Sequence, residues 1–284
     1  MRRIRVLLAG ATGRTGREVA RHLVAQPDLQ LGAALAREGA GGDLGDLAGP
    51  DLAGVPVFAG LEEAHRAAAP QVWVDFTRAA AVEENLLLGV RLGLHPVVGT
   101  SGIRPEKLRE LEAEAERLGV GAAVISNFSL GAMLLAQCAV QVHRWFPDVE
   151  IIELHHATKV DRPSGTALRL AQRLGGEVPI HSVRLPGLMA HQEVLFGADG
   201  EVLTLRHDAL SRSCYGPGVA TAVRKVQRLH RVVYDLEELL EEEERPRRAL
   251  AADGRRHLAV PHGDMMLAGC YGLVRAVRMR EGRG

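Results

Sequence analysis

The sequence predicts an α/β protein in which a doubly wound parallel sheet is joined to a second, inserted α+β domain. Short apolar runs alternate with helical segments over the first 128 residues, which is typical of βαβ units and a parallel sheet. A glycine-rich turn, "GATGRTG", follows the first apolar run. From about residue 129 the pattern changes to a long helix, a strand and a hairpin. We therefore expect a dinucleotide-binding domain over 1–128 and a second domain over 129–211.

The elements of the first domain follow from short apolar runs that end in glycine, serine or threonine. Such runs suit parallel strands, because both faces of a parallel sheet are covered by helices. We expect strands at 4–9, 29–36, 54–60, 72–77, 95–102 and 122–128, with the last of these ending the sheet. Segments with helical spacing or charge-rich composition predict helices at 17–26, 79–92 and 105–118.

The second domain combines helices with strands of a different pattern. Residues 131–146 predict a helix with an apolar face, 149–157 a strand, and 165–174 a second helix. Two strands flank an Asp-Gly turn within 191–209, so we expect an antiparallel unit here. Residues 216–240 predict a long amphipathic helix, with a break midway as the alternative. The pattern degrades over 241–284, to which we assign no role.

Bulk composition excludes several classes of function. The chain has 284 residues, and 35 basic residues balance 35 acidic ones, so no basic field indicates a nucleic-acid partner. No apolar run reaches the roughly 18 residues that a membrane span needs. The cysteines Cys138, Cys214 and Cys270 lie far apart without metal-ligand spacing, which favours reduced thiols in a cytoplasmic protein without a metal site. We expect Trp73 and Trp145 in the core.

The glycine loop predicts a dinucleotide site. Gly10, Gly13 and Gly16 lie between a buried strand and a helix, where glycine allows a tight turn and a close approach of the backbone to phosphate. The alternative is a turn chosen only for packing of the helix on the sheet. The later strand ends at 75–77, 99–102 and 126–128 would line the same crevice, because ligands bind at the carboxyl ends of parallel strands.

The end of the second strand predicts the choice of cofactor. An acidic residue at this point normally binds the adenosine ribose, but the sequence reads Ala36, Arg37, Glu38. The fork of Arg37 suits a 2′-phosphate, and Arg14 could add a second cation. Glu38 could turn inward and restore an acceptor, although its place in "REGAGG" favours a solvated loop. We therefore expect NADPH to be preferred over NADH.

The stretch "ELHHATKVDRPSGTAL" gathers most of the reactive chemistry of the second domain. His155 and His156 would point to opposite faces of a strand, and Lys159 follows on an extended segment before Pro163. Ser164 is a good N-cap, so the free amides of the next helical turn would form an anion site. The pattern suits a carboxylate substrate and a proton donor. The alternative is a polar surface loop followed by an ordinary capped helix.

These motifs resemble the dihydrodipicolinate reductase family, the 4-hydroxy-tetrahydrodipicolinate reductases of lysine and diaminopimelate biosynthesis. The resemblance rests on segments found in this order over about 3–240: "GATGRTG", "VDFT", "VVGTSG", "SNFSLGAMLL", "ELHHATKVDRPSGTA" and "HDALSRSCYGPGVATAVRKV". It implies a Rossmann domain, an inserted α+β domain for substrate binding and tetramerisation, and a C-terminal helix over 212–240 that returns to the first domain. It also implies a homotetramer.

The resemblance implies an NADPH- or NADH-dependent reduction of a cyclic dicarboxylate, with loss of water, and assigns roles to the motif residues. Lys159 is the expected proton donor, His155 the second acid/base group and His156 a substrate ligand, while Ser164, Gly165 and Thr166 are expected to hold a carboxylate. The expected cofactor contacts are Gly10, Ala11, Thr12, Gly13, Arg14, Thr15, Arg37, Gly99, Thr100, Ser101, Ile125, Ser126, Asn127 and Phe128, the last near the nicotinamide. No metal is required by this chemistry.

Several alternatives stay open at the level of the sequence. A non-enzymatic NADP-binding regulator, or an amino-acid dehydrogenase that shares only the first domain, would have a similar glycine loop. Asp161 is expected to orient Lys159 or its loop rather than to act as a base. Arg212 could contact substrate or form a structural ion pair.

Overall fold

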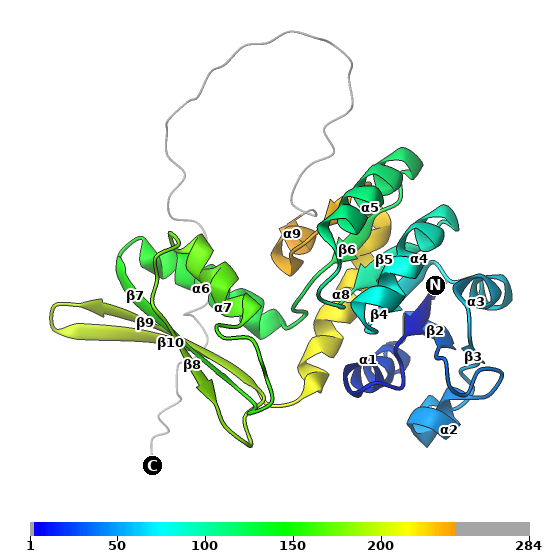
Figure 1. Ribbon diagram of the computed structural model, residues 1–284, viewed down its shortest axis with the longest axis horizontal. Helices are drawn as coiled ribbons and strands as arrows, with labels where there is room; N and C mark the ends of the chain where they lie inside the picture. The colour runs from blue at the N-terminus through cyan, green and yellow to red at the C-terminus, as the bar shows by residue number, and fades with distance from the viewer. Residues whose placement is uncertain (1–2, 242–284) are drawn as a thin grey trace, which may run out of the picture. The chain divides into compact units, whose positions relative to one another are not determined.

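The computed structural model describes residues 3–241, which form two β-sheets with their covering helices (Figure 1). The first sheet has seven strands in the order β11-β6-β5-β4-β1-β2-β3, and all of its pairs are parallel. Its strands are β1 (Ile4–Ala9), β2 (Leu29–Leu35), β3 (Val57–Phe58), β4 (Val72–Asp75), β5 (His95–Val98), β6 (Ala122–Val124) and β11 (Val232–Val233). The order reverses between β1 and β4, which confirms the predicted doubly wound sheet.

Helices cover both faces of this sheet, because successive residues of its strands point to opposite sides. In β1, Val6 and Leu8 join a core with α1 (Arg14–Val24), α2 (Leu44–Ala48) and α8 (Gly216–Lys225). Leu7 and Ala9 join a second core with α3 (Leu61–Ala68), α4 (Ala79–Arg91) and α5 (Pro105–Leu118). Trp73 of β4 is fully buried in the second core, as predicted. A short 3-10 helix, η1 (Pro50–Leu52), follows α2.

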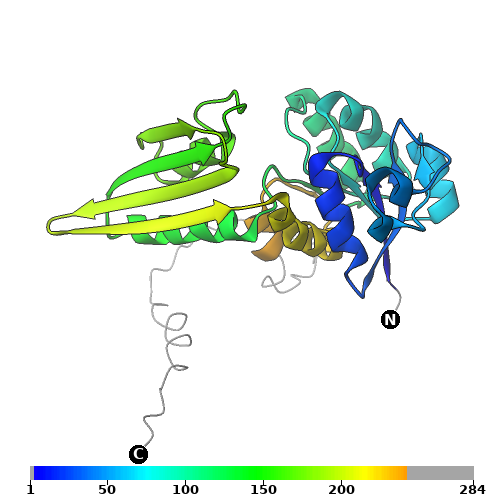
Figure 2. The ribbon, with the colours of Figure 1, turned by 90° about the horizontal axis from the view of Figure 1, so that it is seen from below.

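The second sheet has four strands in the order β10-β9-β7-β8. They are β7 (Asp148–His155), β8 (Ile180–Arg184), β9 (Ala190–Ala198) and β10 (Glu201–Ala209). Two helices, α6 (Leu130–His143) and α7 (Gly165–Arg173), pack on one face around Ile151, Val194 and Phe196. Figure 2 shows α6 along that face of the sheet.

The expected antiparallel unit is only partly right, because the second sheet is mixed. β9 is antiparallel to β7 and β10, but β7 and β8 are parallel. The chain between them includes α7, and a crossover connection of this kind joins parallel neighbours. β8 was not predicted, because two of its side chains on the helix-covered face, Ser182 and Arg184, are polar.

The prediction of one continuous helix over 216–240 is wrong, and the alternative, a helix with a break midway, is confirmed. α8 ends at Lys225 and is followed by η3 (Val226–Arg228), β11 and α9 (Leu236–Glu241). β11 pairs with β6, so residues 122–128 do not end the sheet. Val232 and Val233 form a strand rather than continuing the helix, because the outer edge of β6 offers hydrogen-bond partners to their backbone. Both valines become buried in this arrangement.

Two further expectations concern residues outside the sheets. Trp145 was expected in the core, but this prediction is wrong, because the residue follows the end of α6 at His143 and is 76% exposed. Cys138 and Cys214 are free thiols, and Cys270 lies outside the described residues, as does 242–284. Over 3–241, no helix combines the length and apolar character that crossing a membrane requires.

Candidate active site

The glycine loop connects β1 to α1 and meets both requirements that the sequence suggested. Gly10 has φ +80°, and an added Cβ would lie 2.7 Å from the carbonyl oxygen of Phe76. A Cβ on Gly16 would lie 2.0 Å from the carbonyl oxygen of Gly10, so packing alone requires these two glycines. Gly13 is exposed at the N-cap of α1 without a side-chain cap, and the first amides of the helix therefore stay available to an anion. The packing alternative is thus confirmed for Gly10 and Gly16, and a dinucleotide site at the uncapped helix start stays a prediction.

A buried carboxylate joins the two neighbouring strand ends. Asp75 closes β4 and is 1% exposed, and its Oδ1 accepts hydrogen bonds from the Thr77 amide at 2.9 Å and the Thr77 hydroxyl at 2.7 Å. The Thr100 hydroxyl after β5 donates to the same oxygen at 2.8 Å. Burial raises the pKa of Asp75, and these three donors oppose that shift. One side chain thus fixes the loops after β4 and β5, which the sequence placed along the cofactor crevice.

The third strand end contributes mainly its backbone. Phe128 is 2% exposed, and its ring packs on Phe76 with centroids 5.8 Å apart. Phe76 in turn packs so closely on Gly99 that an added Cβ there would lie 2.2 Å from the ring. Asn127 is partly exposed, and its Oδ1 accepts a hydrogen bond from the Ser129 amide at 2.9 Å. Phe128 is therefore part of the first core, packed on Phe76.

Arg37 lies two residues after the end of β2, next to the strand that carries the glycine loop. Its side chain is exposed, as is that of Glu38, and within residues 3–241 neither forms an ion pair. Ala36 is partly buried against the first core, and its methyl side chain can offer no acceptor to a ribose. The guanidinium of Arg37 is thus available to a ligand in the position that the sequence indicated.

The two adjacent histidines, His155 and His156, lie in different environments. His155 is the last residue of β7, and its Nδ1 hydrogen-bonds Glu153. His156 follows the strand, and its Nδ1 contacts the Thr158 hydroxyl at 2.8 Å. His155 lines a small cavity with Thr166 and Gln192, whereas His156 lines a broad polar cleft. Burial lowers the pKa of His155 below its ordinary value, and the neighbouring Glu153 carboxylate opposes that shift.

Lys159 lies in the loop between β7 and α7 and is tied to its neighbour. Its Nζ donates to both carboxylate oxygens of Asp161, at 2.7 and 2.8 Å. This contact lowers the pKa of the Asp161 carboxyl. Asp161 therefore orients the lysine, as predicted, and remains ionised beside it.

The start of α7 forms the expected capped helix. The Ser164 hydroxyl accepts a hydrogen bond from the Ala167 amide at 3.3 Å, and Ser164 is almost fully buried. Gly165 is exposed, and Thr166 lines two cavities on the side of the helix that faces the third strand end. Thr166 of this first turn thus lines the same small cavity as His155.

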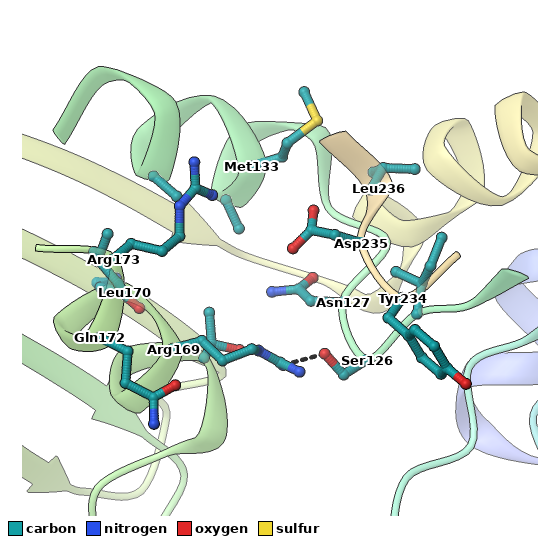
Figure 3. Close-up of a pocket in the computed structure, with 15 residues that line it drawn as sticks. Ser126, Asn127, Met133, Arg169, Leu170, Gln172, Arg173, Tyr234, Asp235 and Leu236 are labelled. Carbon is teal, nitrogen blue, oxygen red and sulfur yellow. Dashed lines mark hydrogen bonds between the residues drawn. The ribbon is translucent and has the colours of Figure 1, made fainter. Parts of the chain in front are cut away.

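A larger cavity of about 400 Å³ lies between α7 and the segment 125–127 (Figure 3). Asn127 and Asp235 enter it from one side, and Arg169 of α7 approaches from the other and donates to the Ser126 hydroxyl. Arg173 lines the cavity one turn further on and pairs with Glu237 at 2.7 Å. The sequence did not indicate Arg169, Arg173, Tyr234 or Asp235, and the only signal was the i, i+4 spacing of the two arginines.

Arg212 lines the broad polar cleft together with Thr12, Arg14 and His156. Within residues 3–241 Arg212 forms no ion pair, so the alternative of a structural ion pair is not supported. The cleft therefore brings residues of the glycine loop and of the histidine motif to one place.

Comparison with known proteins now identifies the family. A model of the N-terminus of dihydrodipicolinate reductase matches residues 4–128, and a model of its C-terminus matches residues 130–240. This chain belongs to the dihydrodipicolinate reductase family. The 4-hydroxy-tetrahydrodipicolinate reductase of Thermosynechococcus vestitus is 44% identical over 267 residues, covering 84% of this chain and 97% of the relative. That of Symbiobacterium thermophilum is 48% identical over 251 residues, covering 84% and 98%.

A solved member of the family has the same architecture. The dipicolinate-bound dihydrodipicolinate reductase from Paenisporosarcina sp. TG-14 is 35% identical, with a TM-score of 0.74 over 83% of this chain and 99% of that one. An amine dehydrogenase from Mycobacterium smegmatis is only 16% identical, with a TM-score of 0.59, and shares the fold alone. Family membership therefore removes the support for a non-enzymatic regulator or an amino-acid dehydrogenase.

The role of Asp75 leads to a prediction about cofactor affinity. Thr100→Val removes the hydroxyl that ties the loop after β5 to Asp75 but keeps the size of the side chain. We expect NADPH to bind about 5- to 30-fold more weakly, because a buried hydrogen bond contributes roughly 1–2 kcal/mol. Fluorescence titration with NADPH measures the change.

The matched control is Thr221→Val, whose hydroxyl returns to the Pro217 carbonyl of its own helix at 2.8 Å. It should leave cofactor binding unchanged. Unaltered NADPH affinity in Thr100→Val would show that the Asp75 contact does not organise the cofactor loops.

Proposed function

We propose roles for individual residues in the reaction of this enzyme. The reaction is the NAD(P)H-dependent reduction of 4-hydroxy-tetrahydrodipicolinate to tetrahydrodipicolinate with loss of water. The activity, a step of lysine and diaminopimelate biosynthesis, follows from family models that cover residues 4–240 and from relatives 44% and 48% identical. The observation that carries the proposal is the convergence of His155, Thr166 and Asn127 on one small cavity. It places the histidine motif beside a strand end of the cofactor domain.

The substrate is a cyclic dicarboxylate, and two groups of this chain suit its carboxylates. The amides of Gly165 and Thr166, with the Thr166 hydroxyl, form an anion site at the start of α7, where Ser164 sets the first turn. His156 faces the polar cleft and serves as a further ligand. The dipicolinate bound to the Paenisporosarcina relative is a cyclic dicarboxylate and supports a substrate of this class.

Lys159 and His155 handle the proton. Addition of a hydride leaves negative charge on the conjugated ring system, and that charge must be neutralised by an acid. The ammonium group of Lys159 attracts the dicarboxylate and can deliver a proton. In the free enzyme this group is held by the Asp161 carboxylate at 2.7 Å, and it is the loop between β7 and α7 that brings it next to His155 along the chain. His155, whose pKa is lowered in the free enzyme, gains affinity for a proton when two carboxylates arrive nearby.

The cofactor supplies the hydride, and the crevice at the strand ends fits it. The open helix start after Gly13 suits the pyrophosphate, and the fixed loops 99–101 and 125–128 complete the crevice. The contacts assigned to the cofactor remain those expected from the sequence: Gly10, Ala11, Thr12, Gly13, Arg14, Thr15, Arg37, Gly99, Thr100, Ser101, Ile125, Ser126, Asn127 and Phe128. The exposed Arg37 favours NADPH over NADH.

The second sheet carries the proposed homotetramer contact. Its face opposite α6 and α7 presents Ile152, Leu154, Val183, Leu195 and Val202, since their neighbours along each strand point into the core. Val202 is 69% exposed. Charged side chains on the same face pair with one another, as Arg206 does with Asp208 at 2.8 Å. An apolar sheet face with internally paired charges suits a second copy of the same chain.

We place the enzyme in the cytoplasm. Cys138 and Cys214 are free thiols, as expected in a reducing compartment. The reaction also consumes reduced nicotinamide cofactor, which biosynthetic enzymes draw from that compartment.

The first test concerns the proton donor. Lys159→Met keeps the length of the side chain and removes its charge, so we expect kcat to fall by about 10²–10⁴-fold, the usual contribution of a positioned acid. His155→Ala should lower kcat by a similar or smaller factor. NADPH oxidation with freshly prepared cyclic substrate measures both effects, and NADPH affinity should hardly change.

Lys107→Met is the matched control, because Lys107 pairs with Glu110 on the surface of α5. Near-normal turnover of Lys159→Met would contradict its assignment as the proton donor.

The second test concerns the cofactor. Wild type should prefer NADPH over NADH by about 1–2 kcal/mol, the scale of one charge-assisted hydrogen bond. Arg37→Ala should weaken use of NADPH and leave NADH nearly unchanged, whereas Ala36→Glu should shift the preference toward NADH. The comparison needs KM and kcat for both cofactors in each variant.

Arg66→Ala, an exposed change on α3, serves as the control for loss of a surface charge. Equal use of NADH by wild type, together with a silent Arg37→Ala, would rule out the proposed role of Arg37.

The third test concerns assembly. Leu195→Asp places a charge in the middle of the apolar sheet face, so we expect the tetramer to dissociate. Leu118→Asp at the end of α5, where Leu118 is 38% exposed, should stay tetrameric. Light scattering gives the mass of each variant, and a monomeric wild type or an unaffected Leu195→Asp would contradict the assignment.

A further inference from the structure

A buried ion pair lies under the proposed substrate site. The side chains of Glu153 on β7 and Arg184 on β8 are 0% and 1% exposed. The guanidinium donates to both carboxylate oxygens, from Nη2 to Oε1 at 2.7 Å and from Nη1 to Oε2 at 2.9 Å. Desolvating two charges is costly, and apolar residues of similar size often stabilise a fold equally well. Stability alone is therefore a weak reason for this pair.

The carboxylate of Glu153 also fixes the ring of His155. Its Oε2 hydrogen-bonds Nδ1 of the imidazole, and because an ionised carboxylate can only accept, Nδ1 must carry the hydrogen. The Arg184 and Ser182 contacts lower the pKa of Glu153 against the effect of burial, so the carboxylate stays ionised. The second ring nitrogen, Nε2, is thereby left to exchange a proton with a ligand.

The guanidinium of Arg184 also contacts the main chain of the loop that carries Lys159. Nη2 donates to the main-chain oxygen of Asp161 at 2.7 Å, in addition to its contact with Glu153. The side chain of the same Asp161 binds Lys159 Nζ at 2.7 and 2.8 Å. A continuous set of hydrogen bonds therefore runs from His155 through Glu153 and Arg184 to the loop that carries Lys159.

We propose that Glu153 and Arg184 are positioning residues for the reductase reaction, acting as one ion pair that aligns His155 and anchors the Lys159 loop. The inference rests on the proposed roles of His155 and Lys159. Neither member of the pair contacts the reacting atoms, and each acts through a group that does. The pair joins strands that are neighbours only in the folded sheet, since the two residues lie 31 positions apart.

The charges around His155 decide the sign of the expected pH effect. Glu153 raises the pKa of His155, whereas burial, Lys159 and Arg184 lower it. His191, His207 and Tyr215 line the same cavity and complete its titratable surroundings. Loss of the Glu153 charge therefore lowers the pKa of His155 further, and the corresponding limb of the pH–rate profile moves to lower pH.

The test is a double-mutant cycle on NADPH oxidation with freshly prepared substrate. We expect Glu153→Gln to lower kcat by roughly 10- to 100-fold, the usual effect of losing a partner that orients a functional histidine. NADPH KM should not change. In a His155→Ala background the same substitution should have much less effect, because the ring that it aligns is gone.

Two further variants make the result decisive. Glu114→Gln is the matched control, because Glu114 lies on α5 of the first domain, outside the proposed substrate site and sheet face, and pairs with Arg91 at 2.7 Å and Arg117 at 2.8 Å. Its activity and pH profile should match wild type. Glu153→Gln/Arg184→Gln avoids leaving a buried guanidinium without its partner and should show the same loss of kcat. Its pH profile should shift in the same direction but by less, because Arg184 itself lowers the pKa of His155.

The outcomes distinguish a failure of the role of His155 from a failure of the positioning role of Glu153 and Arg184. A silent His155→Ala overturns both the role of His155 and the positioning inference. A sensitive His155→Ala with an equal effect of Glu153→Gln in both backgrounds, or with an unshifted pH profile, overturns the positioning inference alone. Failure of Glu153→Gln and of the doubly neutral variant to fold would show that the pair serves folding instead.

Discussion

A carboxylate can be buried only where donors surround it, and the site of this enzyme is built around two such carboxylates. Asp75 collects three donors and thereby ties the loops after β4 and β5. Glu153 collects Arg184 and His155 and lies beneath the histidine motif. Each acid is fully inside its own sheet, so the rigid part of the fold sets the position of loops that would otherwise be free to move.

The two carboxylates do different chemical work. The pKa of Asp75 is raised by burial, since it has hydroxyl and amide donors but no cation, and its second oxygen is buried without a hydrogen-bond partner. Glu153 has a guanidinium against it, which lowers its pKa and keeps it charged. A carboxylate that a cation holds ionised can polarise a histidine. The structure therefore places the acid with a cation partner against His155 and the other acid between the loops after β4 and β5.

Much of this arrangement could be predicted from the sequence, because local patterns encode it. The glycine loop, the Ser164 cap and the positions of the first six strands along the chain follow from residues close together in the sequence. The ion pair could not be predicted, since Arg184 is an isolated polar residue on a strand that lacks an apolar pattern. β11 was also missed, because its two valines fit a helical period until the edge of β6 offers partners. Trp145 was misplaced for a related reason, as its exposure depends on where α6 ends.

The central claim is that Glu153 prepares His155 for proton exchange through Nε2. Nitrogen-15 NMR of His155 in the free enzyme tests it most directly, because the spectrum reports both the tautomer and the pKa of one assigned ring. The account predicts a neutral ring with its hydrogen on Nδ1, a pKa below the ordinary histidine value, and a rise in that pKa when dipicolinate binds. A neutral ring with its hydrogen on Nε2, or a pKa that dipicolinate leaves unchanged, would contradict it.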